Sequence, residues 1–151
     1  MSSFKAFDIA GSGMAAQSVR LNTTASNLAN AESVSGDPNR VYKARHPIFE
    51  AVRAQLQASA MQGQVNGPLN GDNGNAAVRV TGIYESQAPA TARYEPGNPL
   101  ANADGYVYAP AVNVVEEMVN MISASRSYQN NVEVMNTSKD LLLATLRLGQ
   151  G

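Results

Sequence analysis

Residues 114–148 read VVEEMVNMISASRSYQNNVEVMNTSKDLLLATLRL, and their apolar residues recur at alternating spacings of three and four. This spacing is typical of a helix that pairs with another helix as a coiled coil. Asn113 is a candidate N-cap with Glu116 at capping-box spacing, and Gly149 is a candidate C-cap. The helix would be about 52 Å long, whereas the mean globular helix has about 11–12 residues. We therefore expect it to need a partner along its length.

A matching pattern predicts a helix from residue 3 to about residue 29, roughly 40 Å long. All seven prolines lie between the two stretches, from Pro38 to Pro110. We predict that the two terminal helices pair as a coiled coil and that the longer one keeps an uncovered seam for other subunits. The packing seam is predicted to consist of Phe4, Phe7, Met14, Leu21, Leu28, Val114, Met118, Met121, Tyr128, Val132, Met135, Leu142 and Leu146.

The middle of the chain has a different pattern. Residues 76–84 alternate as a strand does, residues 91–95 are a candidate partner for it, and residues 106–108 form a short extended piece. Residues 41–57 are ambiguous because Pro47 argues against an uninterrupted helix and suggests an edge strand. These patterns predict an α+β fold. Its expected parts are a terminal helical domain (1–30 and 113–151) and a β-rich middle domain (31–112) with a flexible loop at about 63–75.

The composition excludes several kinds of site. The chain has no cysteine, so disulfides, zinc–thiolate sites and thiol nucleophiles are ruled out. His46 is the only histidine, and we interpret it as a strand or loop residue rather than a catalytic base or metal ligand. The net charge of −1 gives no electrostatic reason to expect nucleic acid or an anionic membrane as a partner. We expect no cofactor, no metal and no small-molecule substrate.

The first residues, MSSFKAFDIAGSGMAAQSV, lack the continuous apolar core of a cleavable signal peptide. No stretch approaches the roughly 18 apolar residues of a membrane span. If the protein leaves the cytoplasm, we expect it to use a route without a standard signal.

Three stretches resemble the bacterial flagellar rod and hook proteins, and in particular the proximal-rod members of that axial family. The first is a signature that closes the predicted first helix: Ser26, Asn27, Leu28, Ala29 and Asn30. The second is Glu95–Ala101 followed by Gly105–Val107, which is similar to the segment before the last helix of these proteins. The third runs from Asn113 to Gln150, and the opening Phe7–Ser12 fits as well. We interpret Asn27 and Asn30 as structural, with amides that satisfy backbone groups where the helix ends.

The resemblance implies a structural subunit of the flagellar rod, the drive shaft that transmits torque across the periplasm. It implies export through the flagellum's own apparatus without a cleaved signal. It also implies assembly around a central channel, with the terminal helices inside and the β-rich middle outside. The expected partners are other proximal and distal rod proteins, copies of this or near-homologous subunits, the adaptor to the membrane ring, and the export apparatus in transit.

Two other classes of function stay open at this point. One is a secreted coiled-coil protein whose β-rich module binds a peptide or the cell wall. The other is an enzyme, for which the chain offers no constellation of nucleophile, base and metal ligands.

Overall fold

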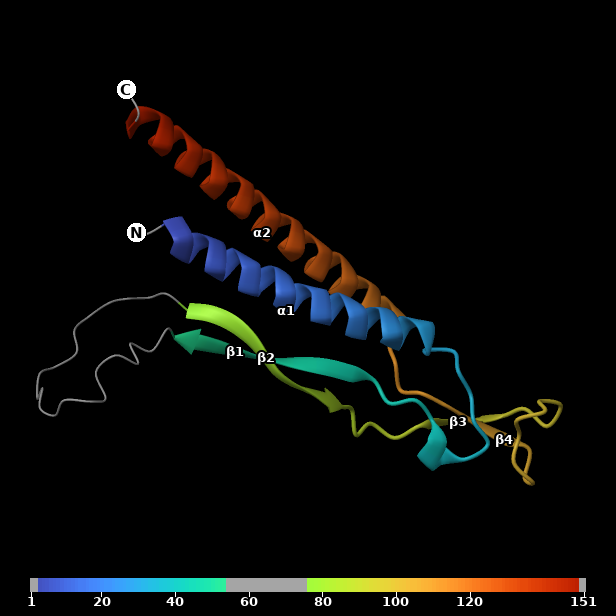
Figure 1. The fold of residues 1–151 in the computed structure, drawn as a ribbon. Coiled ribbons are helices and arrows are strands. Elements are labelled where there is room, and N and C mark those ends of the chain that lie inside the picture. Colours follow the sequence, from blue (N-terminus) through green and yellow to red (C-terminus); the bar gives the residue numbers. More distant parts are fainter. Residues whose placement is uncertain (1–2, 54–75, 150–151) are drawn as a thin grey trace, which may run out of the picture.

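The computed structural model describes residues 3–53 and 76–149, and Figure 1 shows its fold. The long helices are α1 (Ser3–Ala29) and α2 (Val114–Gly149). Between them lie the 3₁₀ turn Pro38–Arg40 and four strands: β1 (Arg45–Arg53), β2 (Ala76–Glu85), β3 (Thr91–Tyr94) and β4 (Tyr106–Ala109). The predicted α+β fold, with long terminal helices and a small middle region of strands, is confirmed. The loop predicted at 63–75 lies outside the described residues.

α1 lies between α2 on one side and the β1–β2 hairpin on the other (Figure 1). The two helices run antiparallel. Arg20 Nη2 donates to Asn120 Oδ1 over 2.9 Å near the end of α1 and the start of α2. Further along, Gly11 of α1 lies against Met135 of α2. The predicted pairing of the terminal helices is therefore present within one chain.

The start of α2 is fixed by its N-cap. The side chain of Asn113 accepts hydrogen bonds from the backbone N–H groups of Val115 (3.1 Å) and Glu116 (3.3 Å). An asparagine cap satisfies N–H groups that have no partner inside the helix. The N-cap predicted from the sequence is thus confirmed.

β1 and β2 form an antiparallel two-stranded sheet with Arg45 opposite Glu85. The register shifts between Ile48, which faces Gly82, and Phe49, which faces Val80, so Thr81 is the extra residue of a bulge. Pro47 lies inside β1. A sheet of two strands has only edge strands, where a residue without an N–H group is tolerated. The ambiguous region around Pro47 is therefore an edge strand.

The expected pairing of residues 91–95 with 76–84 is wrong. β3 pairs instead with β4, with Thr91 opposite Ala109 and Tyr94 opposite Tyr106. The connection between them closes at Gly105, whose φ of +80° is in the region that favours glycine. The residues between β2 and β3 include Pro89 and carry the chain away from the first sheet, so the two hairpins stay separate.

The core of the described chain is built from small residues. The buried hydrophobic residues are Ala10, Ala16, Ala31, Val41, Ala44, Val107, Ala109 and Ala124. Larger apolar side chains stay exposed on both long helices and on the hairpins. Exposed apolar surface of this extent marks contacts with other molecules. In the described residues, neither long helix is apolar enough over its length to cross a membrane.

Candidate assembly interface

The signature at the end of α1 forms a hydrogen-bonded clamp around Asn27, which is completely buried. Its Nδ2 group donates to the Arg45 carbonyl over 2.9 Å, and its Oδ1 atom accepts from the Arg45 N–H over 2.8 Å. The same Oδ1 atom accepts from the Tyr42 hydroxyl over 2.9 Å. One side chain of α1 thus holds both backbone groups of the first residue of β1. It fixes the point at which the hairpin begins relative to the helix.

The neighbouring signature residues support this clamp. Ser26 Oγ shares a hydrogen bond of 3.1 Å with the Tyr42 hydroxyl, and Asn30 Nδ2 donates to the Ser26 carbonyl over 2.8 Å. Leu28 is half-buried and Ala29 is exposed. The Asn30 amide therefore satisfies a backbone group at the helix end, as expected, whereas the Asn27 amide satisfies the backbone groups of Arg45 at the start of β1. Tyr42 has no sequence signal that would have identified it as a partner.

On α1, the predicted seam residues Phe7, Met14, Leu21 and Leu28 are all half-buried. For Phe4, the structure describes only the backbone. At Gly13, an added Cβ would lie 2.7 Å from Asn131 Nδ2 of α2. A glycine at this point lets the two helix backbones approach closely.

On α2, the predicted seam divides into two groups. Val114, Met121, Val132, Met135 and Leu142 are half-buried, whereas Met118, Tyr128 and Leu146 are exposed. The buried residues of α2, Glu117 and Ala124, lie beside the predicted seam. Asn131, seven residues after Ala124, lies against α1. Pairing within one chain thus covers only part of the predicted seam. The exposed group remains a prediction for contacts between subunits.

Two buried polar atoms of the helix pair have no hydrogen-bond partner among the described residues: Gln17 Oε1 and Glu117 Oε2. Glu117 lies in the first turn of α2, where a negative charge complements the helix dipole, and its side chain is only 4% exposed. Polar groups in the helix pair and small side chains such as Ala124 make this contact weaker than a leucine-rich seam.

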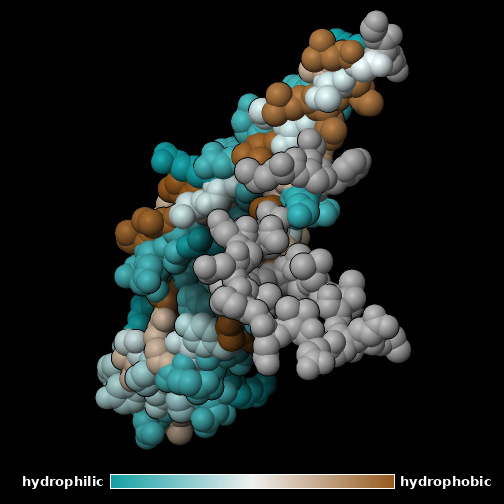
Figure 2. All heavy atoms as spheres, turned by 90° about the vertical axis from the view of Figure 1, so that its left-hand side faces the viewer, coloured by the Kyte–Doolittle hydropathy of each residue, from teal (hydrophilic) through white to brown (hydrophobic). Residues whose placement is uncertain are grey.

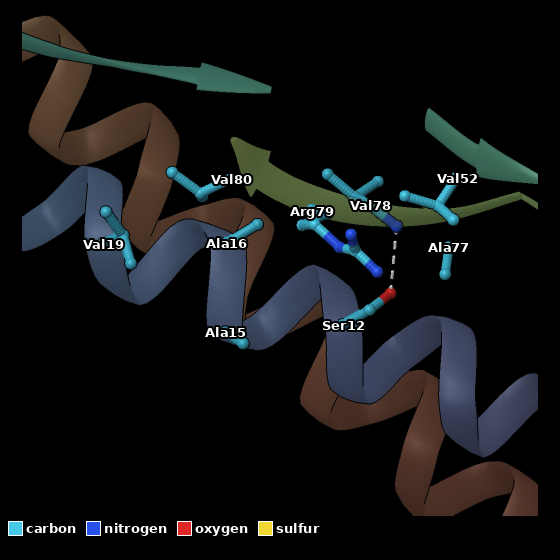
Figure 3. A pocket seen from close by; sticks show the side chains of 9 residues that line it. All are labelled: Ser12, Ala15, Ala16, Val19, Val52, Ala77, Val78, Arg79 and Val80. Atoms are coloured by element: carbon cyan, nitrogen blue, oxygen red, sulfur yellow. Dashed lines mark hydrogen bonds between the residues drawn. The ribbon is translucent and has the colours of Figure 1, made fainter. Parts of the chain in front are cut away.

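A shallow apolar groove of about 410 Å³ runs between α1 and β2 (Figure 3). Ala15, Ala16 and Val19 line it from α1, and Val78 and Val80 from β2. A single hydrogen bond crosses it, from the Val78 N–H to Ser12 Oγ over 3.1 Å. The groove offers packing surface and carries no pair of groups suited to acid–base catalysis.

No group of three or more potential metal ligands occurs in residues 3–53 and 76–149. His46 lies in β1, with its ring 5.4 Å from that of Tyr84. It is therefore a strand residue, one of the two places that the sequence suggested.

Comparisons with known proteins agree with this architecture. Residues 7–36, which hold the signature, match the family model described as flagella basal body rod protein. Residues 103–148, which hold most of α2, match the model described as flagellar basal body rod FlgEFG protein C-terminal.

Relatives match over nearly the whole chain. The flagellar basal-body rod protein FlgC of Salmonella typhimurium is 54% identical over 144 residues, which cover 95% of this chain and 96% of that protein. FlgC of Yersinia enterocolitica is 51% identical over 150 residues, or 99% of this chain and 100% of the relative. FlgC of Bacillus subtilis is 34% identical over 157 residues, which cover 99% of this chain and 100% of that protein. The chain therefore belongs to the family of flagellar basal-body rod proteins.

Proposed function

We propose that this protein is a structural subunit of the proximal rod of the bacterial flagellum. It assembles with other axial proteins into the drive shaft that transmits torque across the periplasm. The observation that supports this proposal is the long helix pair, whose apolar side chains stay exposed in a single chain. The chain is also similar to FlgC over nearly its whole length.

The physical task fits this shape. A shaft under torque needs many contacts along extended surfaces, and it needs no reaction centre. α2 has 36 residues and exposes apolar side chains from its first turns to its last. In the assembled rod we place the helices toward the central channel and the β-rich part outside. The layered arrangement supports this assignment, because α1 separates α2 from the β1–β2 hairpin (Figure 1).

The proposed partners are other proximal and distal rod proteins, copies of this or near-homologous subunits, and the adaptor that joins the rod to the membrane ring. The protein reaches the periplasmic rod through the flagellar export apparatus without a cleaved signal peptide. It works without catalysis, cofactor, nucleic acid or small-molecule substrate. The alternative of a wall- or peptide-binding module has no support from the comparisons, which match rod proteins at both ends of the chain.

Deletion and complementation test this function. A flagellated strain that lacks the gene should build no rod beyond the missing subunit, carry no hook or filament, and not swim. A plasmid copy should restore all three, and a tagged copy should co-purify with basal bodies. A deletion strain that swims and carries complete basal bodies would refute the proposal.

A further inference from the structure

Within the described residues, the β1–β2 sheet consists of two strands, so each of them is an edge strand. Every second residue of such a strand points its backbone N–H and C=O groups away from the partner strand. A row of unpaired groups of this kind is a template for a strand of another chain. The hairpin also exposes large apolar side chains: Ile48, Phe49, Ile83 and Tyr84. The sheet therefore needs protection along both edges.

α1 covers the edge of β1 where the strand begins. The Ser86 N–H donates to the Ala44 carbonyl over 2.8 Å, so residue 44 faces the partner strand and Arg45 faces the open edge. Asn27 binds both backbone groups of Arg45, the carbonyl at 2.9 Å and the N–H at 2.8 Å. A carboxamide offers N–H donors and a carbonyl acceptor, as a peptide group does. Asn27 thus occupies the place that a residue of a third strand would take.

The next position on this edge is Pro47, two residues after Arg45. Proline has no N–H group, so a strand that approached here would find no donor. Proline is also one of the residues by which proteins block an exposed sheet edge. Neither of these two positions on the edge of β1 therefore offers a free N–H group to another chain.

α1 also reaches the edge of β2. The Val78 N–H donates to Ser12 Oγ over 3.1 Å, so this N–H points away from β1 (Figure 3). Ser12 Oγ itself donates to the Ile9 carbonyl over 2.8 Å, which holds the hydroxyl in place and leaves its oxygen to accept from Val78. Val78 lies opposite Ala51, toward the other end of the hairpin from Arg45. One helix therefore binds both edges, at two separate points along the sheet (Figure 1).

We propose that α1 blocks both edges of the β1–β2 sheet in the single chain and so prevents two copies from pairing edge to edge. Asn27 and Ser12 supply the block, and Pro47 extends it along β1. The inference goes beyond the proposed function, because it concerns a chain that is not yet part of an assembly. Such a chain exposes hydrophobic side chains along its projecting helical arm (Figure 2). Apolar surface brings copies together, and a blocked sheet edge keeps these encounters from growing into a shared sheet.

Two variants of the purified full-length chain open the edge of β1 in different ways. Asn27→Ala frees both backbone groups of Arg45, whereas Pro47→Val restores an N–H group and leaves the hydrogen bonds of Asn27 in place. Both variants should form multimers that bind thioflavin T, a dye that reports stacked β-strands, at concentrations where the natural chain forms none. All chains are compared at a temperature at which circular dichroism shows them to be folded.

Asn30→Ala is the matched control for Asn27→Ala. It also removes an asparagine hydrogen bond at the end of α1, but the acceptor of that bond is the Ser26 carbonyl of the same helix and not a strand. This variant should give no more dye signal than the natural chain.

A further substitution separates edge pairing from a loss of stability. Because the Val78 N–H points away from β1, the N–H of Ala51 opposite points away from β2. Ala51→Pro therefore removes an edge donor without removing a hydrogen bond between the two strands. Added to Asn27→Ala or to Pro47→Val, it should return the dye signal and the mass measured by light scattering to those of the natural chain, while the melting temperature does not rise.

Three results would overturn the inference: both edge variants stay monomeric and bind no dye, their multimers persist after Ala51→Pro is added, or Asn30→Ala forms the same multimers. If Asn27→Ala does not fold, Pro47→Val decides alone. Swimming is not measured in this experiment, so the proposed function can stand while the edge block fails.

Discussion

Replacing Asn27 should destabilise the protein more than any other change at the signature. Its side chain makes three hydrogen bonds of 2.8–2.9 Å, to both backbone groups of Arg45 and to the Tyr42 hydroxyl. Asn27→Ala removes all three and leaves their partners short of hydrogen bonds at a buried site. A buried polar group without a partner costs about 1–3 kcal/mol, and water can reach part of the exposed Arg45, so we expect a loss of about 2–4 kcal/mol.

Asn27→Asp isolates the role of the donor. A carboxylate keeps the shape and can still accept from the Arg45 N–H and from Tyr42, but it cannot donate to the Arg45 carbonyl and instead repels it. We expect a loss at least as large as that of Asn27→Ala. Tyr42→Phe, which removes the hydroxyl alone, should cost about 1 kcal/mol.

The assay is unfolding of the purified full-length chain, followed by circular dichroism. For a chain of this size, 1 kcal/mol shifts the melting temperature by about 2–4 °C, so Asn27→Ala should lower it by roughly 4–16 °C. Asn22→Ala is the matched control, because Asn22 is exposed on the same helix. Its effect should stay within about 0.5 kcal/mol. Equal melting temperatures for Asn27→Ala and Asn22→Ala would refute the clamp.

Three further predictions concern packing and backbone. Leu142→Asp or Met135→Asp places an unpaired charge on the helix seam at a cost of several kcal/mol, so export should persist while swimming fails. Cells with the control Ala103→Asp, at an exposed loop position, should swim normally. Swimming of cells with either seam variant would remove these residues from the interface. Gly11→Ala should stabilise the chain by about 1 kcal/mol through helix propensity, since the added Cβ fits at 3.9 Å from Met135. Gly13→Ala should stabilise it less, because its Cβ would lie 2.7 Å from Asn131 Nδ2. Unfolding midpoints in the reverse order would contradict the close contact at Gly13. Gly105→Ala should lower the stability by about 1–2 kcal/mol, because of the positive φ and a contact of 2.9 Å between the added Cβ and Tyr94. In the control Gly97→Ala, the added Cβ meets nothing within 4 Å. Equal unfolding midpoints for these two variants would show that the turn at Gly105 is not constrained.

Local signals predicted the helices well. The cap at Asn113 sets the start of α2, and the absence of proline outside Pro38–Pro110 leaves both helices uninterrupted. Gly149, the candidate C-cap, lies inside α2 as its last described residue. Strand partners were harder, because alternation identifies a strand but does not say which strand it pairs with. Residues 91–94 therefore received the wrong partner.

The helix seam shows a second limit of sequence patterns. A repeat of seven residues drifts around a helix of 3.6 residues per turn, so a long heptad pattern does not mark a single face. The exposed seam residue Met118 and the buried Glu117 are neighbours in sequence, and only the packing of α1 distinguishes them. Buried polar groups such as Glu117 depend on tertiary contacts and leave no pattern in the chain.

The central claim is that neighbouring subunits cover the apolar surface that one chain leaves exposed on its helices. A density map of the assembled basal body, with this chain traced in it, tests that claim most directly. We predict that Met118, Tyr128 and Leu146, which are 50%, 38% and 61% exposed in the single chain, lie against side chains of other rod subunits. A map in which these three residues face water would contradict the account.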